Sequence, residues 1–92
     1  MTQDQAETIA LQALGWIASS DDLLDVFMGA TGSGRDELRA RAQETEFLAA
    51  VLDFLVMDDK WVTGFCDATG VPYDTPMRAR AALPGGEQVH WT

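Results

Sequence analysis

The chain contains two copies of one sequence unit, and this repeat limits its fold more than any other feature. The second copy follows the first at a shift of 38 positions, and one residue, Pro76, is inserted near its end. Because a short repeat unit cannot bury its apolar face alone, we expect the two copies to pack on each other about a pseudo-twofold axis. The matched positions are Leu14 and Leu52, Asp21 and Asp59, Phe27 and Phe65, the Ala-Thr-Gly runs at 30–32 and 68–70, and the Arg-Ala-Arg-Ala runs at 39–42 and 78–81.

Apolar residues recur every three or four positions, which is typical of helices with one buried face, and no segment shows the strict alternation of a half-buried strand. The sequence therefore predicts an all-α fold of about six helices in one compact domain. Two pseudo-symmetric helix-turn-helix-like repeats, at about 9–42 and 47–83, make up a helical domain over 1–84, and the tail 85–92 is expected to be flexible. The predicted helices span about 5–18, 21–31, 34–42, 46–57, 58–69 and 76–83.

Several residues fit the ends of these helices. Gly32 and Gly70 follow the apolar stripes of the second and fifth helices, where a left-handed residue commonly ends a helix. Ser33 with Asp36 resembles a capping box for the third helix, and Thr45 can cap the fourth. We expect the fourth helix to form the centre of the core, because its apolar face is the widest.

Length and cysteine content limit the class of protein. A chain of 92 residues forms one domain with a thin core, and its single cysteine, Cys66, cannot form an internal disulfide. The first ten residues lack the features of an export signal. The most apolar stretch, 47–57, is well short of the roughly 20 residues that cross a bilayer. We therefore expect a cytoplasmic protein that does not enter the membrane.

The charge is negative overall and segregated along the chain. The net charge of −9 disfavours general binding to nucleic acid or to anionic membranes, whose phosphates attract cations. One of the six basic residues is Lys60, and the other five lie in or beside the repeated Arg-Ala-Arg runs. These five are Arg35, Arg39, Arg41, Arg78 and Arg80.

Helical geometry separates the arginines of these runs. With Leu38 taken as buried in the third helix and Met77 in the sixth, one arginine of each run lies at the core edge and the other points further outward. We expect the first kind to pair with carboxylates, and the second kind to be free for an acidic or phosphate-bearing partner. The core-edge pair is Arg41 and Arg80, and the freer pair is Arg39 and Arg78.

Three tryptophans are more than a domain of this size can fully bury. Trp16 and Trp61 fall on the apolar stripes of predicted helices, and core positions are expected for both. Trp91 in the tail is the expected exposed anchor. The candidate partner surface therefore consists of Arg35, Arg39, Arg78 and Trp91.

Three sequence patterns resemble functional sites but lack other features that such sites require. The glycine-rich run 29–35 has neither the preceding strand of a dinucleotide site nor the lysine of a phosphate loop, so it fits a helix end and turn. Cys66 lies on an apolar stripe, and His90 lies in the tail, so a nucleophile and base are not expected to meet. The aspartates at 21–25 and 58–59 fit first helical turns and match no calcium loop or zinc set. No catalytic, cofactor-binding or metal-binding residue is predicted.

The sequence resembles one known family. The resemblance is carried by the repeated Phe-x-x-Ala-Thr-Gly, the run 47–55, the pair Asp58-Asp59 and the closing Ala-Leu-Pro-Gly-Gly at 82–86. These motifs are similar to those of the domain-of-unknown-function 3572 family, across nearly the whole chain. The resemblance implies a small helical cytosolic protein of bacteria, and it implies no catalytic or binding residue.

These observations favour a non-enzymatic protein-interaction or regulatory module with an unidentified protein partner. The alternative is a nucleic-acid-binding protein in which Arg39 and Arg78 of the helix-turn-helix-like units contact phosphates, although the net charge opposes it. A small enzyme ranks third, because no adjacent nucleophile, base and orienting group is found. A homodimer stays open, since a thin core often goes with a twofold interface.

Overall fold

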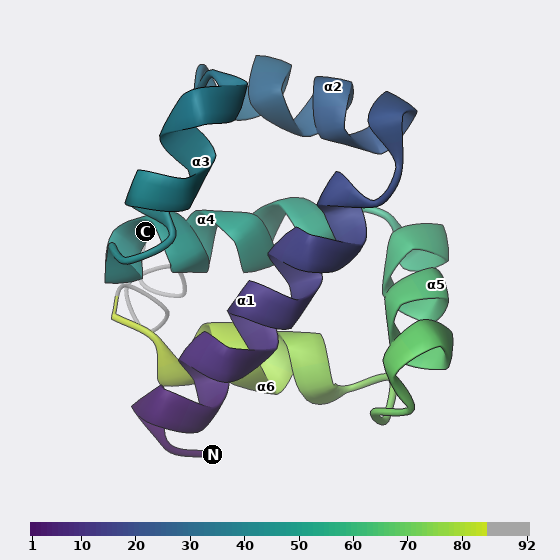
Figure 1. Cartoon of the computed structure of the whole chain (residues 1–92). Coiled ribbons are helices and arrows are strands. Elements are labelled where there is room, and N and C mark those ends of the chain that lie inside the picture. Colours follow the sequence, from purple (N-terminus) through teal and green to yellow (C-terminus); the bar gives the residue numbers. More distant parts are fainter. Residues whose placement is uncertain (85–92) are drawn as a thin grey trace.

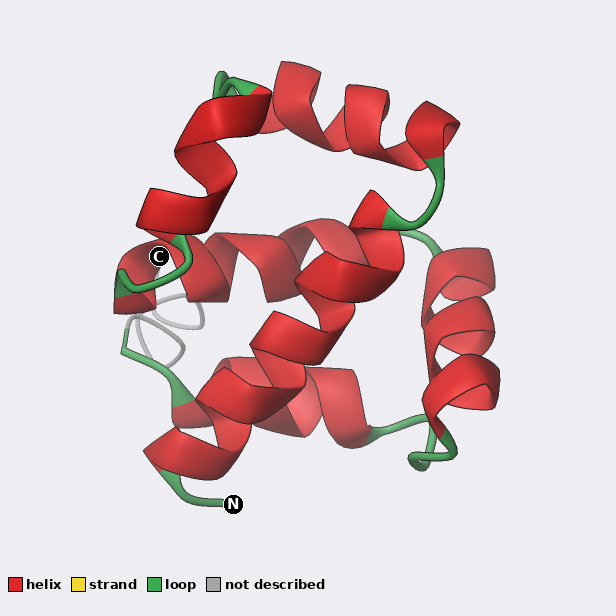
Figure 2. Cartoon of the chain, in the orientation of Figure 1, coloured by secondary structure: helices red, strands yellow, loops and turns green. Residues whose placement is uncertain are grey.

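The computed structural model describes residues 1–84 of the chain, and this part contains six α-helices and no strand (Figures 1 and 2). The predicted all-α fold is confirmed. The prediction of a flexible tail falls on 85–92, outside the described residues. The helices are α1 (Gln3–Ala18), α2 (Asp21–Thr31), α3 (Arg35–Arg41), α4 (Thr45–Leu55), α5 (Asp59–Thr69) and α6 (Thr75–Ala82).

Helix α4 lies at the centre of the fold. Helix α1 crosses it, and α6 packs against both, whereas α2 with α3 and α5 lie around this crossing (Figure 1). The prediction of a central α4 agrees with its burial, because apolar side chains all round a helix require neighbours on every side. The buried residues of α4 are Phe47, Leu48, Ala49, Val51, Leu52, Phe54 and Leu55.

The equivalent helices α2 and α5 begin and end in the same way. Ser20 and Asp58 are the N-caps, and each side chain accepts a hydrogen bond from a backbone N–H of the first turn. Gly32 and Gly70 end the helices with φ of 70° and 78°, a left-handed conformation that favours glycine. The predicted glycine stops are confirmed, so the repeated Ala-Thr-Gly is a helix-ending motif.

Two capping predictions were wrong, because the side chains find partners in the tertiary structure. The N-cap of α3 is Gly34, and its N–H donates to Oε1 of Glu37 at 3.0 Å. Ser33 is instead buried, and its hydroxyl accepts a hydrogen bond from Arg41. Thr45 is the first residue of α4, and its hydroxyl donates to Oε2 of Glu7 on α1 at 3.1 Å.

The predicted buried face of α6 was also wrong. Met77 is 53% exposed, whereas Leu38, its counterpart in α3, is 8% exposed. The inserted Pro76 is itself buried, together with Ala79, three positions further on. Because one inserted residue turns a helical face by about 100°, α6 presents a different face to the core from the one that the repeat suggests.

Aromatic contacts join the two halves in both directions. Phe54 of α4 packs edge-on against Phe27 of α2, with ring centroids 5.1 Å apart. Trp16 of α1 packs edge-on against Phe65 of α5 at 6.3 Å. Trp16 and Phe54 are equivalent in the repeat, as are Phe65 and Phe27, so the long helix of each half contacts the second helix of the other. A pseudo-twofold relation of the whole halves stays a prediction.

Candidate functional site: a groove between the two halves

An open groove of about 390 Å³ lies where the two halves meet. Its walls come from the end of α1, the first half of α2 and the start of α5. Leu23 and Trp61, which are equivalent in the repeat, both line it, so the two halves contribute corresponding positions to one groove. The lining residues are Trp16, Ser20, Asp22, Leu23, Val26 and Trp61.

Inner aromatic rings hold the two indoles of the groove. Trp61 stacks on Phe54 with ring centroids 4.6 Å apart and an angle of 20° between the rings. Trp16 is held against Phe65. Both tryptophans are half-buried, so each has one side on the core and another at the groove. Such rings offer large apolar contact area at little cost in conformational entropy.

A glycine makes room for one of these indoles. A Cβ at Gly64 of α5 would lie 2.8 Å from Cζ2 of Trp16, closer than side-chain atoms pack. The equivalent position in α2 is Val26, which lines the groove and is 53% exposed. At this pair of equivalent positions, therefore, the first half has the exposed Val26 side chain, and the second half has Gly64, which leaves space for the Trp16 indole.

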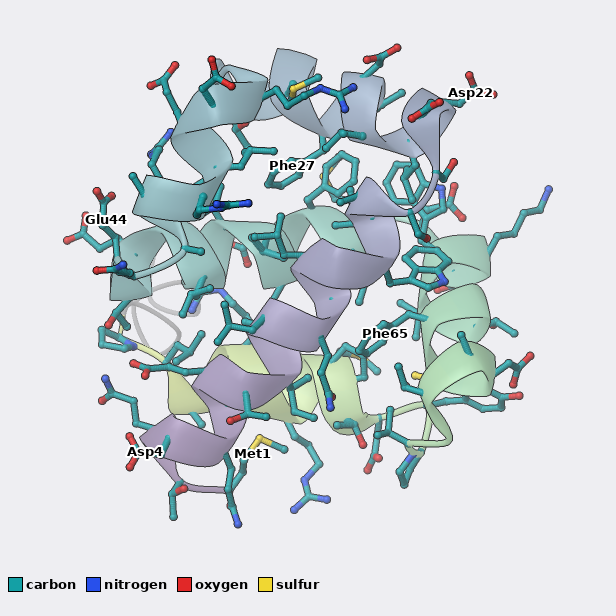
Figure 3. The ribbon with its side chains drawn as sticks, viewed as in Figure 1. Met1, Asp4, Asp22, Phe27, Glu44 and Phe65 are labelled. Carbon is teal, nitrogen blue, oxygen red and sulfur yellow. The ribbon has the colours of Figure 1, made fainter. Side chains whose placement is uncertain are left out.

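The two helix starts beside the groove are acidic. Helices α2 and α5 both start beside it, and their caps and first turns carry Asp21, Asp22, Asp58 and Asp59 against a single cation, Lys60. Asp22 lines the groove itself, and Figure 3 labels it at the start of α2. These carboxylates are stabilised by the positive ends of the helix dipoles, and they leave a net negative charge at the helix starts beside the apolar groove.

The two core-edge arginines are engaged as predicted. The Nε of Arg80 donates to Oδ1 of Asp53 at 2.6 Å. Arg41 lies 4.6 Å from the ring centroid of Phe47, donates to Ser33, and has its Nε 3.8 Å from Oε1 of Glu44. Both cations therefore serve the packing of the fold.

The structure does not gather the predicted partner residues on one surface. Arg35 and Arg39 are exposed on α3, and Arg78 is exposed on α6, and Figure 1 shows these helices on opposite sides of α4. In the part of the chain that the structure describes, none of the three forms an ion pair. Arg78 borders a shallow groove of about 460 Å³ with Ile9 of α1. Trp91 lies outside the described residues.

Cys66 has the surroundings of a packing residue. It is buried, and its Sγ donates to the carbonyl oxygen of Pro72 at 3.4 Å. Burial, followed by the negative charges of Asp67 and Asp74, raises the pKa of the thiol, so the neutral form is favoured at neutral pH. His90 lies outside the described residues. Over residues 1–84 no three acidic, cysteine or histidine side chains cluster as metal ligands, and none of the helices could cross a membrane.

Sequence reasoning missed the groove because it assigned Trp16 and Trp61 to the core. Each does lie on an apolar stripe and does pack on the core. Their shared place in one groove depends on how the end of α1 meets the starts of α2 and α5, and no local sequence pattern indicates this. The sequence feature that could have indicated the groove was the number of tryptophans, because a thin core cannot fully enclose three such large side chains.

Comparison with curated proteins and with solved structures finds no match. A family model described as protein of unknown function (DUF3572) matches residues 3–86, nearly the whole of the chain. The motifs of the resemblance are explained by the fold, since the Ala-Thr-Gly runs end α2 and α5 and the run 47–55 forms the central helix. The chain therefore belongs to the DUF3572 family of proteins of unknown function.

Proposed function

We propose that this protein is a non-enzymatic protein-interaction module of the cytoplasm that binds its partner in the groove between its two halves. The observation that carries the proposal is that two half-buried tryptophans, Trp16 and Trp61, and the exposed Val26 line a single groove. Tryptophan is enriched among the residues that dominate protein interfaces. An apolar surface that is rimmed by charge is typical of an interaction site.

The arrangement of polar groups supports binding over catalysis. The groove holds one hydroxyl, from Ser20, and one carboxylate, from Asp22. The Ser20 hydroxyl accepts the capping hydrogen bond of α2 from the N–H of Leu23 at 3.4 Å, and in the described part of the chain it makes no hydrogen bond to a carboxylate or an imidazole. Activation of a hydroxyl nucleophile needs such a base.

The positions of the arginines favour a protein partner over nucleic acid. Phosphate contacts gain affinity when several cations follow one backbone, whereas Arg39 and Arg78 are carried by helices on opposite sides of α4. Asp22 also lines the groove, and it and the other aspartates at the starts of α2 and α5 repel phosphate.

The proposal is tested by affinity capture from a lysate of the source organism with three matched variants. Val26→Lys places a cation in the groove, Ala40→Lys makes the same charge change on exposed α3, and Arg39→Ala/Arg78→Ala removes the predicted cations. Circular dichroism checks that all are folded. We expect one saturable protein partner that is lost only with Val26→Lys.

Loss of the partner with Arg39→Ala/Arg78→Ala alone would move the site to the arginines. Nuclease-sensitive capture would support the nucleic-acid alternative instead. Capture that is unchanged by Val26→Lys would contradict the groove as the binding site.

A further inference from the structure

We propose that the occupant of the groove is a basic amphipathic helix of a partner protein, with apolar side chains between Trp16 and Trp61 and with Lys or Arg side chains toward the aspartates at the starts of α2 and α5. This inference rests on the proposed function and goes further by naming the chemistry of the partner. Its basis is an apolar groove lined by one carboxylate, Asp22, beside two helix starts in which aspartates outnumber cations.

The size and the lining of the groove suit a few apolar anchor residues. At about 390 Å³ it is small and open, and most of its exposed wall is apolar and contributed by the indoles, Leu23 and Val26. An amphipathic helix fits such a site by placing residues i, i+3, i+4 and i+7 in the groove. Peptides that add a strand need a sheet edge, and residues 1–84 contain no sheet.

The charge around the groove selects the polar face of that helix. Asp22 of α2 lines the groove, and the starts of α2 and α5 beside it also carry Asp21, Asp58 and Asp59, with Lys60 as the one cation. A helix with Lys or Arg beside its apolar stripe therefore meets Asp22 and a net negative charge at these two helix starts. Complementary charges at such short range raise the association rate and exclude wrong partners.

The same charge disfavours a second copy of this chain as occupant. A twofold dimer through the groove would bring the aspartates of α2 and α5 toward their own copies. The net charge of −9 adds a general repulsion between two copies. The basic helix is therefore favoured over self-association at this site.

The inference is tested with three synthetic helical peptides of equal length and the purified full-length chain. The first has a leucine stripe at helical spacing with lysine on its polar face, the second has the same stripe with glutamate, and the third has the composition of the first with its stripe scrambled. Fluorescence anisotropy of labelled peptides measures Kd. We expect the lysine peptide to bind at least about tenfold more tightly than either control, and to weaken with added salt.

The groove is located with the charge-matched variants. Val26→Lys is expected to weaken the lysine peptide by about tenfold, and Ala40→Lys by less than about twofold. Equal binding of the lysine and glutamate peptides, no binding of either, or equal effects of the two variants would overturn the inference. A concentration-dependent dimer in analytical ultracentrifugation that Val26→Lys abolishes would overturn it as well, in favour of a second copy of the chain as occupant.

The two experiments fail in distinguishable ways. If the captured partner depends on Val26 but the lysine peptide shows no preference, the groove remains the binding site and the basic helix is wrong. If capture does not depend on Val26, the proposed function fails as well.

Discussion

Helices α3 and α6 carry the same Arg-Ala-Arg-Ala run and yet pack differently. Ala79 of α6 is fully buried where this helix meets α1 and α4, whereas its counterpart Ala40 on α3 is exposed. Helix α3 buries one residue, Leu38, and is further held by the contacts of Arg41. The repeat therefore determines where helices form, and the neighbours of each helix determine which face is buried.

The largest expected effect comes from comparing Leu38 of α3 with its counterpart in the repeat, Met77 of α6. Leu38→Ala should destabilise the protein by about 2–4 kcal/mol, because it leaves a cavity under α3. Met77→Ala should change stability by no more than about 0.5 kcal/mol, because the side chain is half in solvent. Urea unfolding of both variants measures the difference. Equal losses in the free energy of unfolding would contradict it, because they would mean that the two residues are buried alike.

The alanine between the two arginines gives the opposite comparison, because here the residue of α6 is buried and that of α3 is exposed. Ala79→Leu adds three carbons between closely packed helices and should cost about 1–3 kcal/mol. Ala40→Leu adds the same atoms at an exposed position of α3 and should be neutral within about 0.5 kcal/mol. Thermal unfolding of the pair checks this. A destabilised Ala40→Leu would mean that α3 is packed as closely as α6.

The two core-edge arginines differ in how much they depend on one carboxylate. Asp53→Ala removes the 2.6 Å partner of Arg80, whose Nη1 is already buried without a hydrogen bond, and should cost about 1 kcal/mol. Glu44→Ala removes an exposed partner of Arg41 at 3.8 Å and should cost less than about 0.5 kcal/mol, since Ser33 and Phe47 still hold the guanidinium. Urea unfolding in low and high salt measures the loss of stability in each variant. A larger loss for Glu44→Ala than for Asp53→Ala would contradict this ranking.

The smallest effects test the groove wall. Gly64→Ala should cost about 1 kcal/mol or less and change the near-ultraviolet circular dichroism, because the new methyl group displaces the Trp16 indole. Gly29→Ala in α2 meets no atom within 4 Å and should stabilise the protein by about 0.5–1 kcal/mol. A stabilising Gly64→Ala with an unchanged spectrum would show that the indole lies elsewhere.

Local features of the fold could be predicted from the sequence. The glycine stops at Gly32 and Gly70 and the central role of α4 follow from rules that act within a few residues, and the structure agrees with each. The pairing of Arg80 at the core edge was also predicted, although its partner was not, because Asp53 lies 27 residues away.

Features that depend on long-range packing could not be predicted. The partners of Ser33 and Thr45 lie on other turns or other helices, and Met77 is exposed because an inserted residue rotated α6. The groove required the helix ends of both halves to meet, so its tryptophans were assigned to the core. The candidate site that the sequence favoured, on Arg35, Arg39 and Arg78, is divided between two helices.

The most direct test of the binding groove is site-specific photo-crosslinking in the source organism, with a photoreactive amino acid at Val26 and, in separate strains, at Arg39 and Arg78. We expect one protein adduct from position 26, insensitive to nuclease, and weak or absent adducts from the two arginine positions. A strong adduct at Arg39 or Arg78 with none at position 26 would contradict it and return the binding surface to the arginines.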